Sequence, residues 1–143
     1  MSSTAIARTP AFTGKAFIKS FTHASMPTFG TNDRVKFGAD DQLLAAVTGP
    51  DDLSFGHVYQ QNGNTVDVIM DGTAIIVVQV VASGTATRGS YAVMSSTANK
   101  YQDAADNGGG TTPQYIAGRF MSSGTDLDYV SMLIGGVNMR TVT

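Results

Sequence analysis

Residues 55–81 read FGHVYQQNGNTVDVIMDGTAIIVVQVV and form the most regular part of the chain. Two dipeptides in this stretch, Asn62-Gly63 and Asp71-Gly72, are strong hairpin signals, because a type I′ turn needs positive φ at both central positions. Between them, Asn64–Met70 alternates apolar and polar residues, as a half-buried strand does. Thr73–Val81 is then nearly continuous Ile and Val. The pattern predicts a three-stranded antiparallel meander.

Further short strands are predicted on both sides of this meander. Asp33–Phe37 alternates charged and apolar side chains, and Asp40–Val47 fits either a helical turn or a strand. The remaining expected strands are Ser90–Met94, Ala98–Gln102, Tyr115–Met121 and Leu127–Ile134. About eight or nine strands at this spacing favour a compact antiparallel sandwich or small barrel.

The composition supports the all-β class. The 143 residues include 16 Gly and 11 acidic residues, and all the acids are Asp, so the acidic helix former Glu is missing. With no Cys, neither disulfides nor thiolate metal sites are expected. The first 30 residues lack a signal-peptide pattern, which predicts synthesis in the cytoplasm, and no membrane span is expected.

The first 32 residues differ from the rest. They hold Arg8, Lys15 and Lys19 with no acid, whereas residues 33–143 hold six basic and 11 acidic residues. This segment also carries four of the seven Phe, unlike a disordered linker. We therefore predict an extended, docked N-terminal arm over residues 1–32, against its own body or a neighbour, and a single all-β domain over residues 33–143.

No reactive constellation emerges from the sequence. Thr13–Ala16 lacks the upstream Gly and the hydroxyl of a phosphate-binding loop, and a calcium loop from Asp103 would have Gln114 at its twelfth position. His23 and His57 are the two histidines, too few for a zinc site, and His57 is expected to fill a sheet face. Paired carboxylates occur in turn-like contexts or, for Asp126 and Asp128, on a solvated strand face. The expectation is a non-enzymatic protein with no catalytic residues, no metal and no cofactor.

An ordered series of short features resembles the capsid decoration, or cement, proteins of tailed bacteriophages. The hydrophobic meander ends in Ile75–Val78 and is followed by Gly89–Met94 and a short polar strand around Ala98–Tyr101. Tyr115–Phe120 then leads through Ser123-Gly124 to a final strand, Asp128–Ile134. The resemblance covers roughly 100 residues.

This resemblance implies a structural virion protein on the outer capsid surface that stabilises the shell. Its expected partners are the major capsid protein and further copies of itself, as a homotrimer, with neither membrane nor direct nucleic-acid binding. The hypothesis for the arm is that it contacts the capsid or a neighbouring subunit. Deletion of residues 1–30 is then expected to abolish capsid binding and to leave the body folded. The arm residues in this hypothesis are Arg8, Phe12, Lys15, Phe17, Lys19, Phe21 and Phe29.

Three alternatives stay open at this point. One is another phage component, such as a tail-tube, fibre or minor capsid protein. The second is a small trimeric all-β nucleotide-hydrolysing enzyme, whose companion motifs are missing. The third is a carbohydrate-binding sandwich, which usually displays aromatic platforms, whereas this chain has no Trp.

Overall fold

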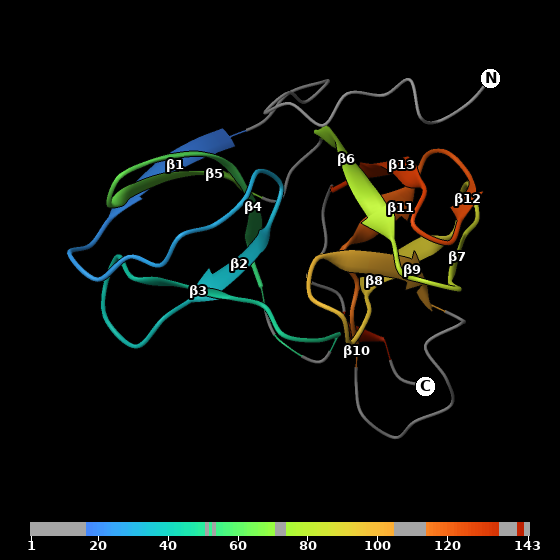
Figure 1. The fold of residues 1–143 in the computed structure, drawn as a ribbon, viewed down its shortest axis with the longest axis horizontal. Helices are drawn as coiled ribbons and strands as arrows, with labels where there is room; N and C mark the ends of the chain where they lie inside the picture. Colours follow the sequence, from blue (N-terminus) through green and yellow to red (C-terminus); the bar gives the residue numbers. More distant parts are fainter. Residues whose placement is uncertain are drawn as a thin grey trace.

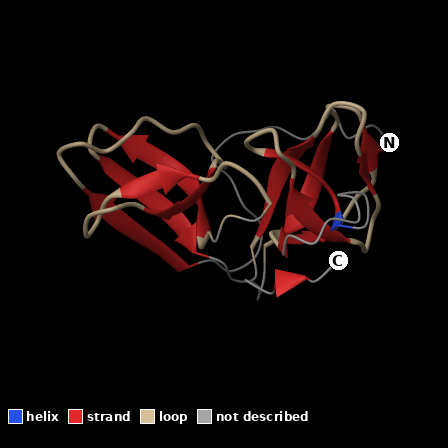
Figure 2. Cartoon of the chain, turned by 90° about the horizontal axis from the view of Figure 1, so that it is seen from below, coloured by secondary structure: helices blue, strands red, loops and turns tan. Residues whose placement is uncertain are grey.

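The computed structural model describes residues 17–50, 52, 54–70, 74–104, 114–134 and 140–141. The chain is all-β, as predicted, and consists of two bodies (Figure 1). Residues 17–70 form a five-stranded sheet, and strands between residues 75 and 134 form a closed five-stranded barrel. A view from below shows the strands of each body grouped separately (Figure 2). The predicted small barrel is thus present, together with a separate sheet.

The five-stranded sheet has the order β1-β5-β4-β2-β3, with all neighbours antiparallel. Its strands are β1 (Phe17–Thr22), β2 (Arg34–Phe37), β3 (Leu44–Ala46), β4 (Gly56–Asn62) and β5 (Thr65–Met70). The segment expected to be either a helical turn or a strand therefore contains β3. The distance between two rings shows that the sheet is strongly curled. The Phe21 ring of β1 lies 6.2 Å from the Phe37 ring of β2, although β2 is three strands away in the order.

The β4–β5 hairpin was predicted, but its turn is shifted by one residue. Asn62 pairs with Thr65, so the central turn residues are Gly63 and Asn64 rather than Asn62 and Gly63. Gly63 has a φ of 62°, whereas Asn64 is not among the described residues with positive φ. Positive φ at the first central position alone is the pattern of a type II′ turn, which Gly adopts without steric cost.

The predicted third strand of the meander is present, but its predicted pairing with the second strand is wrong. Residues 75–80 form β6 (Ile75–Val80), but β6 pairs with strands of the barrel and not with β5. The position beside β5 is taken by β1, in an unbroken register from Phe17 opposite Met70 to Thr22 opposite Thr65. Asp71-Gly72, the expected turn, lies outside the described residues. The chain therefore leaves the sheet after β5 and enters the barrel.

The barrel closes in the order β11-β13-β6-β9-β8. Its strands are β6, β8 (Tyr91–Met94), β9 (Lys100–Asp103), β11 (Gly118–Phe120) and β13 (Tyr129–Leu133). The β6–β9 pair is parallel and contains two register pairs, whereas the other barrel contacts are antiparallel. Two small sheets complete the described fold, one from β7 (Thr85–Ala86) and β12 (Gly124–Thr125), the other from β10 (Gln114–Tyr115) and β14 (Arg140–Thr141).

Each body has its own hydrophobic core. The curled sheet encloses Phe21, Met26, Val35, Leu44, Val58, Val66 and Val68. The barrel core includes Ile76, Val78, Phe120, Val130 and Met132, and it also takes in Val47 and Ile69 from the sheet. Ile69 reaches the barrel because it lies on the opposite face of β5 from Val66 and Val68. The two bodies therefore pack together through the outer face of the sheet.

The predicted boundary at residue 32 does not match this structure. Residues 17–22 are extended and docked, as expected of the arm, but they dock on their own chain as a full strand of the sheet. The following loop contributes Met26, which is 8% exposed, to the same core. Residues 1–16 lie outside the described part of the chain. In the described part, the body thus begins with β1.

Candidate functional site

A buried polar seam joins the sheet to the barrel. The pairing of β6 with β9 is confined to Gln79 and Val80, and upstream of it the Val77 carbonyl accepts a hydrogen bond of 2.9 Å from the Asn32 side-chain amide. The Arg34 backbone N–H donates to Asn99 Oδ1 at 2.9 Å. Both contacts cross from the sheet body to the barrel, so they fix how the two bodies meet.

His57 lies at the centre of this seam with its ring wholly buried. Arg34 places a guanidinium nitrogen 3.3 Å from His57 Nδ1, and His57 Nε2 is 3.3 Å from the Tyr101 hydroxyl. A guanidinium only donates, so Nδ1 must accept, and the ring is neutral with its proton on Nε2, which donates to Tyr101. Burial, and secondly the Arg34 charge, lower the pKa of His57 well below its usual range. As expected, His57 fills a sheet face and is closed to substrates.

The paired carboxylates have structural roles. Asp126 Oδ1 accepts the Ser83 N–H at 2.9 Å, and Asp128 Oδ2 accepts the Thr125 N–H at 2.9 Å. The expectation that Asp126 and Asp128 share a strand face is wrong, because both lie in the turn between β12 and β13, where Asp126 has a φ of 28°. Both carboxylates instead cap turn amides, a common use of Asp.

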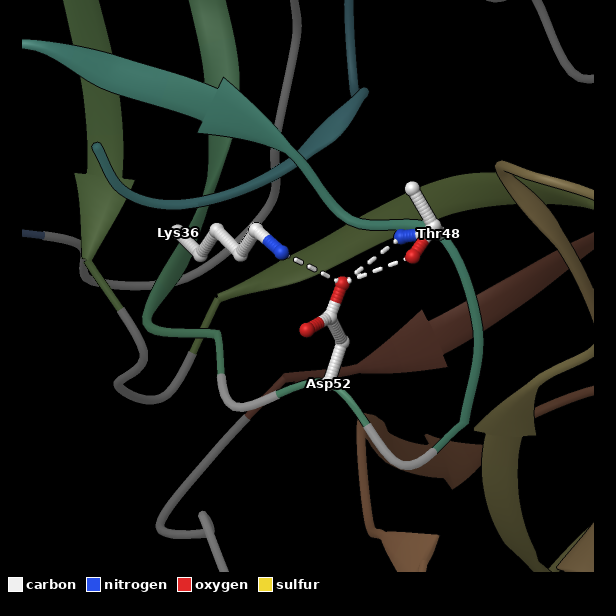
Figure 3. A network of polar contacts seen from close by, with 3 residues as sticks. All are labelled: Lys36, Thr48 and Asp52. Atoms are coloured by element: carbon white, nitrogen blue, oxygen red, sulfur yellow. Dashed lines mark hydrogen bonds and ion pairs between the residues drawn. The ribbon is translucent and has the colours of Figure 1, made fainter. Parts of the chain in front are cut away.

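Asp52 ties the loop after β3 to β2 (Figure 3). One carboxylate oxygen accepts from Lys36 Nζ at 2.8 Å, and from the backbone N–H and hydroxyl of Thr48 at 3.0 Å each. Partial burial alone raises the pKa of Asp52, but the hydrogen bonds from Lys36 and Thr48 outweigh it and lower the pKa below its usual value. The three contacts therefore brace the loop that connects β3 to β4 within the sheet.

A shallow groove of about 350 Å³ lies along the β7–β12 pair. It is lined by Thr85, Ala86, Thr87, Ser123, Gly124, Thr125 and Asp128. Several of its polar groups are already engaged: Thr87 donates its hydroxyl to Asp103 at 2.6 Å, and Ser123 accepts the Arg88 N–H at 2.9 Å. The groove brings together hydroxyls and one carboxylate, Asp128, which accepts the Thr125 N–H, and none of its lining side chains is a base.

Across the described residues, no group of three or more His, Cys, Asp or Glu is placed to hold a metal ion. The carboxylate of Asp103, first residue of the calcium loop considered above, accepts the Thr87 N–H and hydroxyl. In the same part of the chain, no helix is long and apolar enough to cross a membrane.

The structure separates the residues predicted to make capsid or subunit contacts. Arg8, Phe12 and Lys15 lie outside the described residues. Phe21 is 3% exposed and belongs to the sheet core, and the half-buried Phe29 packs against that core and donates its N–H to Gln61 Oε1 at 2.8 Å. Neither residue is available as an anchor for a partner, because both are used inside the body.

Phe17 and Lys19 remain at the surface. Phe17 is 68% exposed at the first position of β1, and Lys19 Nζ lies 5.4 Å from the centre of the Phe21 ring. In the described chain, β1 is an edge strand whose sole neighbour is β5. Its other edge presents backbone N–H and C=O groups, which can template a further strand.

Sequence reasoning missed a second exposed aromatic. Phe37 is 62% exposed, and its ring stacks on Phe55 with centroids 4.1 Å apart and planes inclined by 8°. Phe37 alternates with Val35 and so shares the core face, as predicted. Phe37 is, however, the last residue of β2. Alternation alone carries no signal for such an end effect.

Comparisons with protein-family models, with curated proteins and with solved structures found no match for this chain.

Proposed function

We propose that this chain is a non-catalytic structural virion protein that binds the outer surface of a phage capsid and stabilises the shell. The observation that carries the proposal is the edge strand β1, with Phe17 exposed beside the open edge. The basic segment with Arg8, Phe12 and Lys15 runs directly into that strand. A strand edge and an adjoining apolar, basic segment together suit recognition of an extended backbone.

The adhesive role needs a rigid body, and the described fold supplies one. The barrel has no free sheet edge within its closed ring, and the seam of Asn32, Arg34 and His57 locks it to the sheet. A stiff body loses little conformational entropy on binding, so more of the contact energy appears as affinity. Assembly of three copies, as the resemblance implies, would multiply a modest affinity through effective concentration.

A sharper deletion follows from the position of β1. Removal of residues 1–30 would take away β1 and Met26 and thereby open the sheet core, so it cannot test binding alone. Removal of residues 1–16 leaves all of β1 in place. We expect this shorter deletion to keep the fold and to abolish binding.

The test mixes the protein with expanded, undecorated shells of the phage that encodes it and measures co-sedimentation. Full-length protein is expected in the pellet at saturating, lattice-defined stoichiometry, and the 1–16 deletion in the supernatant. The double variant Arg8→Ser/Lys15→Ser is expected to bind more weakly than wild type at low salt, and this difference should narrow at higher salt because salt screens the charges that wild type uses. Arg88→Ser, which removes an exposed charge from the body, serves as the control. Full-length protein that stays in the supernatant would contradict the proposal.

A further inference from the structure

The outer face of the barrel carries an apolar row. Register pairs place Ile75 of β6 opposite Leu133 of β13, Leu133 opposite Arg119 of β11, and Arg119 opposite Tyr91 of β8. Directly opposed residues point to the same side of a sheet. Their neighbours Ile76, Met132, Phe120 and Ala92 fill the interior. The row of four therefore points outward.

Outward positions of a barrel are ordinarily polar. Here Ile75 and Leu133 are half-buried, Tyr91 is 45% exposed, and the charged member, Arg119, lies over the Tyr91 ring at 5.1 Å. Val77, two residues along β6, and Met121, which is 42% exposed, extend the surface. Tyr, Met and Arg are the residue types enriched in the buried centre of protein contacts.

The N-terminal segment starts within reach of this row. Phe17 is paired with Met70, and residues 71–74 separate Met70 from Ile75. Five residue steps span at most about 18 Å, and paired Cα atoms lie about 5 Å apart, so Phe17 is within about 24 Å of Ile75. Residues 1–16 can extend about 50 Å, and the row across four strands is about 15 Å wide. The segment is long enough to cross it.

The composition of the segment fits this surface. Residues 1–16 contain Ile6 and Phe12, several Ala and no acid. In the turn that precedes β13, the exposed Leu127 lies between Asp126 and Asp128, whose carboxylates offer a counter-charge to Arg8. In such a contact the apolar side chains of the segment face the row, and the Arg8 guanidinium faces the two carboxylates.

We infer that residues 1–16 dock on the outer face of their own barrel, with Phe12 against the row formed by Ile75, Leu133, Arg119 and Tyr91. In the free protein this contact covers an apolar surface that would otherwise face water. Residues 1–16 are also the segment proposed to bind the capsid shell. Docking on the barrel therefore comes first, and the segment leaves the barrel when it binds the shell. This last step alone rests on the proposed function.

The experiment uses the free, full-length protein and needs no capsid, so its failure leaves the proposed function standing. Phe12 is replaced by the photo-reactive amino acid p-benzoylphenylalanine, and an equal mixture of ¹⁵N-labelled and unlabelled protein is irradiated. Cross-linked peptides are identified by mass spectrometry. We expect links within one isotope species to peptides that contain residues 75–77, 91, 119–121 or 131–133.

Two further variants show whether the row is responsible. Leu133→Ser is expected to reduce the cross-link yield at least fivefold, whereas Phe37→Ser, at an exposed aromatic of the other body, is expected to leave it unchanged. If Leu133→Ser lowers the melting temperature, Tyr91→Ser supplies a second test at a more exposed position. Links only to the sheet body, links between isotope species, or no links at all would overturn the inference.

Discussion

The guanidinium of Arg34 faces Nδ1 of His57 at 3.3 Å, where Arg34 is 2% exposed and His57 is fully buried. The pair sits between the sheet and the barrel, and Tyr101 of the barrel contacts the other ring nitrogen at 3.3 Å. Because the ring must stay neutral to accept from Arg34, this contact makes the union of the two bodies sensitive to acid.

The free energy of unfolding is predicted to decrease as the pH is lowered, because of His57. In the folded state the pKa of His57 lies below its unfolded value of about 6.5. Below that pH the unfolded chain therefore binds a proton while the His57 ring of the folded chain stays unprotonated, and the folded state loses stability. Between pH 7.5 and 5.5 this loss is at most about 1.4 kcal/mol, the limit reached when the folded ring takes up no proton over that range. Urea unfolding at both pH values should show it. His57→Gln should remove that part of the pH dependence.

The control for this prediction is the other histidine. His23 is partly exposed, and its Nε2 lies 3.5 Å from Asp40. His23→Gln should keep the fall between pH 7.5 and 5.5. An equal slope in wild type and His57→Gln would show that the seam does not titrate as described.

The placement of β1 is tested by two phenylalanines of the same strand. Phe21→Ala should reduce the free energy of unfolding by about 3–5 kcal/mol, because Phe21 fills the sheet core and contacts the Phe55 ring edge-to-face at 5.6 Å. Phe17→Ala, at a side chain that is 68% exposed, should change it by less than about 0.5 kcal/mol. Equal and small effects of the two changes would mean that β1 is not part of the body.

Barrel closure depends on Gly118. A Cβ at this position would lie 2.3 Å from the Leu133 carbonyl oxygen, a backbone atom that cannot move without breaking the β11–β13 pair. Gly118→Ala should therefore cost about 2 kcal/mol or more in thermal or chemical unfolding. Gly30→Ala, where the nearest atoms are 3.4 Å away on the Asp33 side chain, should stay within about 1 kcal/mol of wild type. A neutral Gly118→Ala would contradict the described closure.

The Asp52 contact should contribute modestly and depend on pH. Asp52→Asn should lower the free energy of unfolding by about 1 kcal/mol at pH 7, since Lys36 and Thr48 lose a charged acceptor in a partly exposed site. Because the folded pKa of Asp52 is lowered, this contribution is present above the unfolded value of about 3.9 and is lost as pH falls through the folded pKa. Asp41→Asn, at an exposed position, is the control and should show no such loss.

The sequence was informative where structure is local. Alternation in Asn64–Met70 and a glycine turn specify the β4–β5 hairpin, because pleat and turn act over a few residues. The same alternation could not reveal that Ile69, on the polar face of β5, would be buried by the barrel. Nor could two adjacent hairpin signals show that β1, more than 40 residues upstream, takes the place beside β5.

The contact role of the N-terminal segment stays a prediction. Residues 17–22 are docked, but on the sheet of their own chain. Phe21 and Phe17 look alike in the sequence and differ in burial by strand position alone. The outward row of the barrel joins strands from four separate segments, so no short motif could indicate it. The burial of Phe21 and the make-up of the outward row both depend on how strands far apart in the sequence pair with one another.

The proposed capsid role is tested most directly by electron cryo-microscopy of undecorated shells incubated with the full-length protein. We expect symmetric added density on the outside of the shell that fits the two-body fold, and we expect this density to be lost for the 1–16 deletion. Bare shells at saturating protein, or density at the tail of intact particles instead, would contradict it.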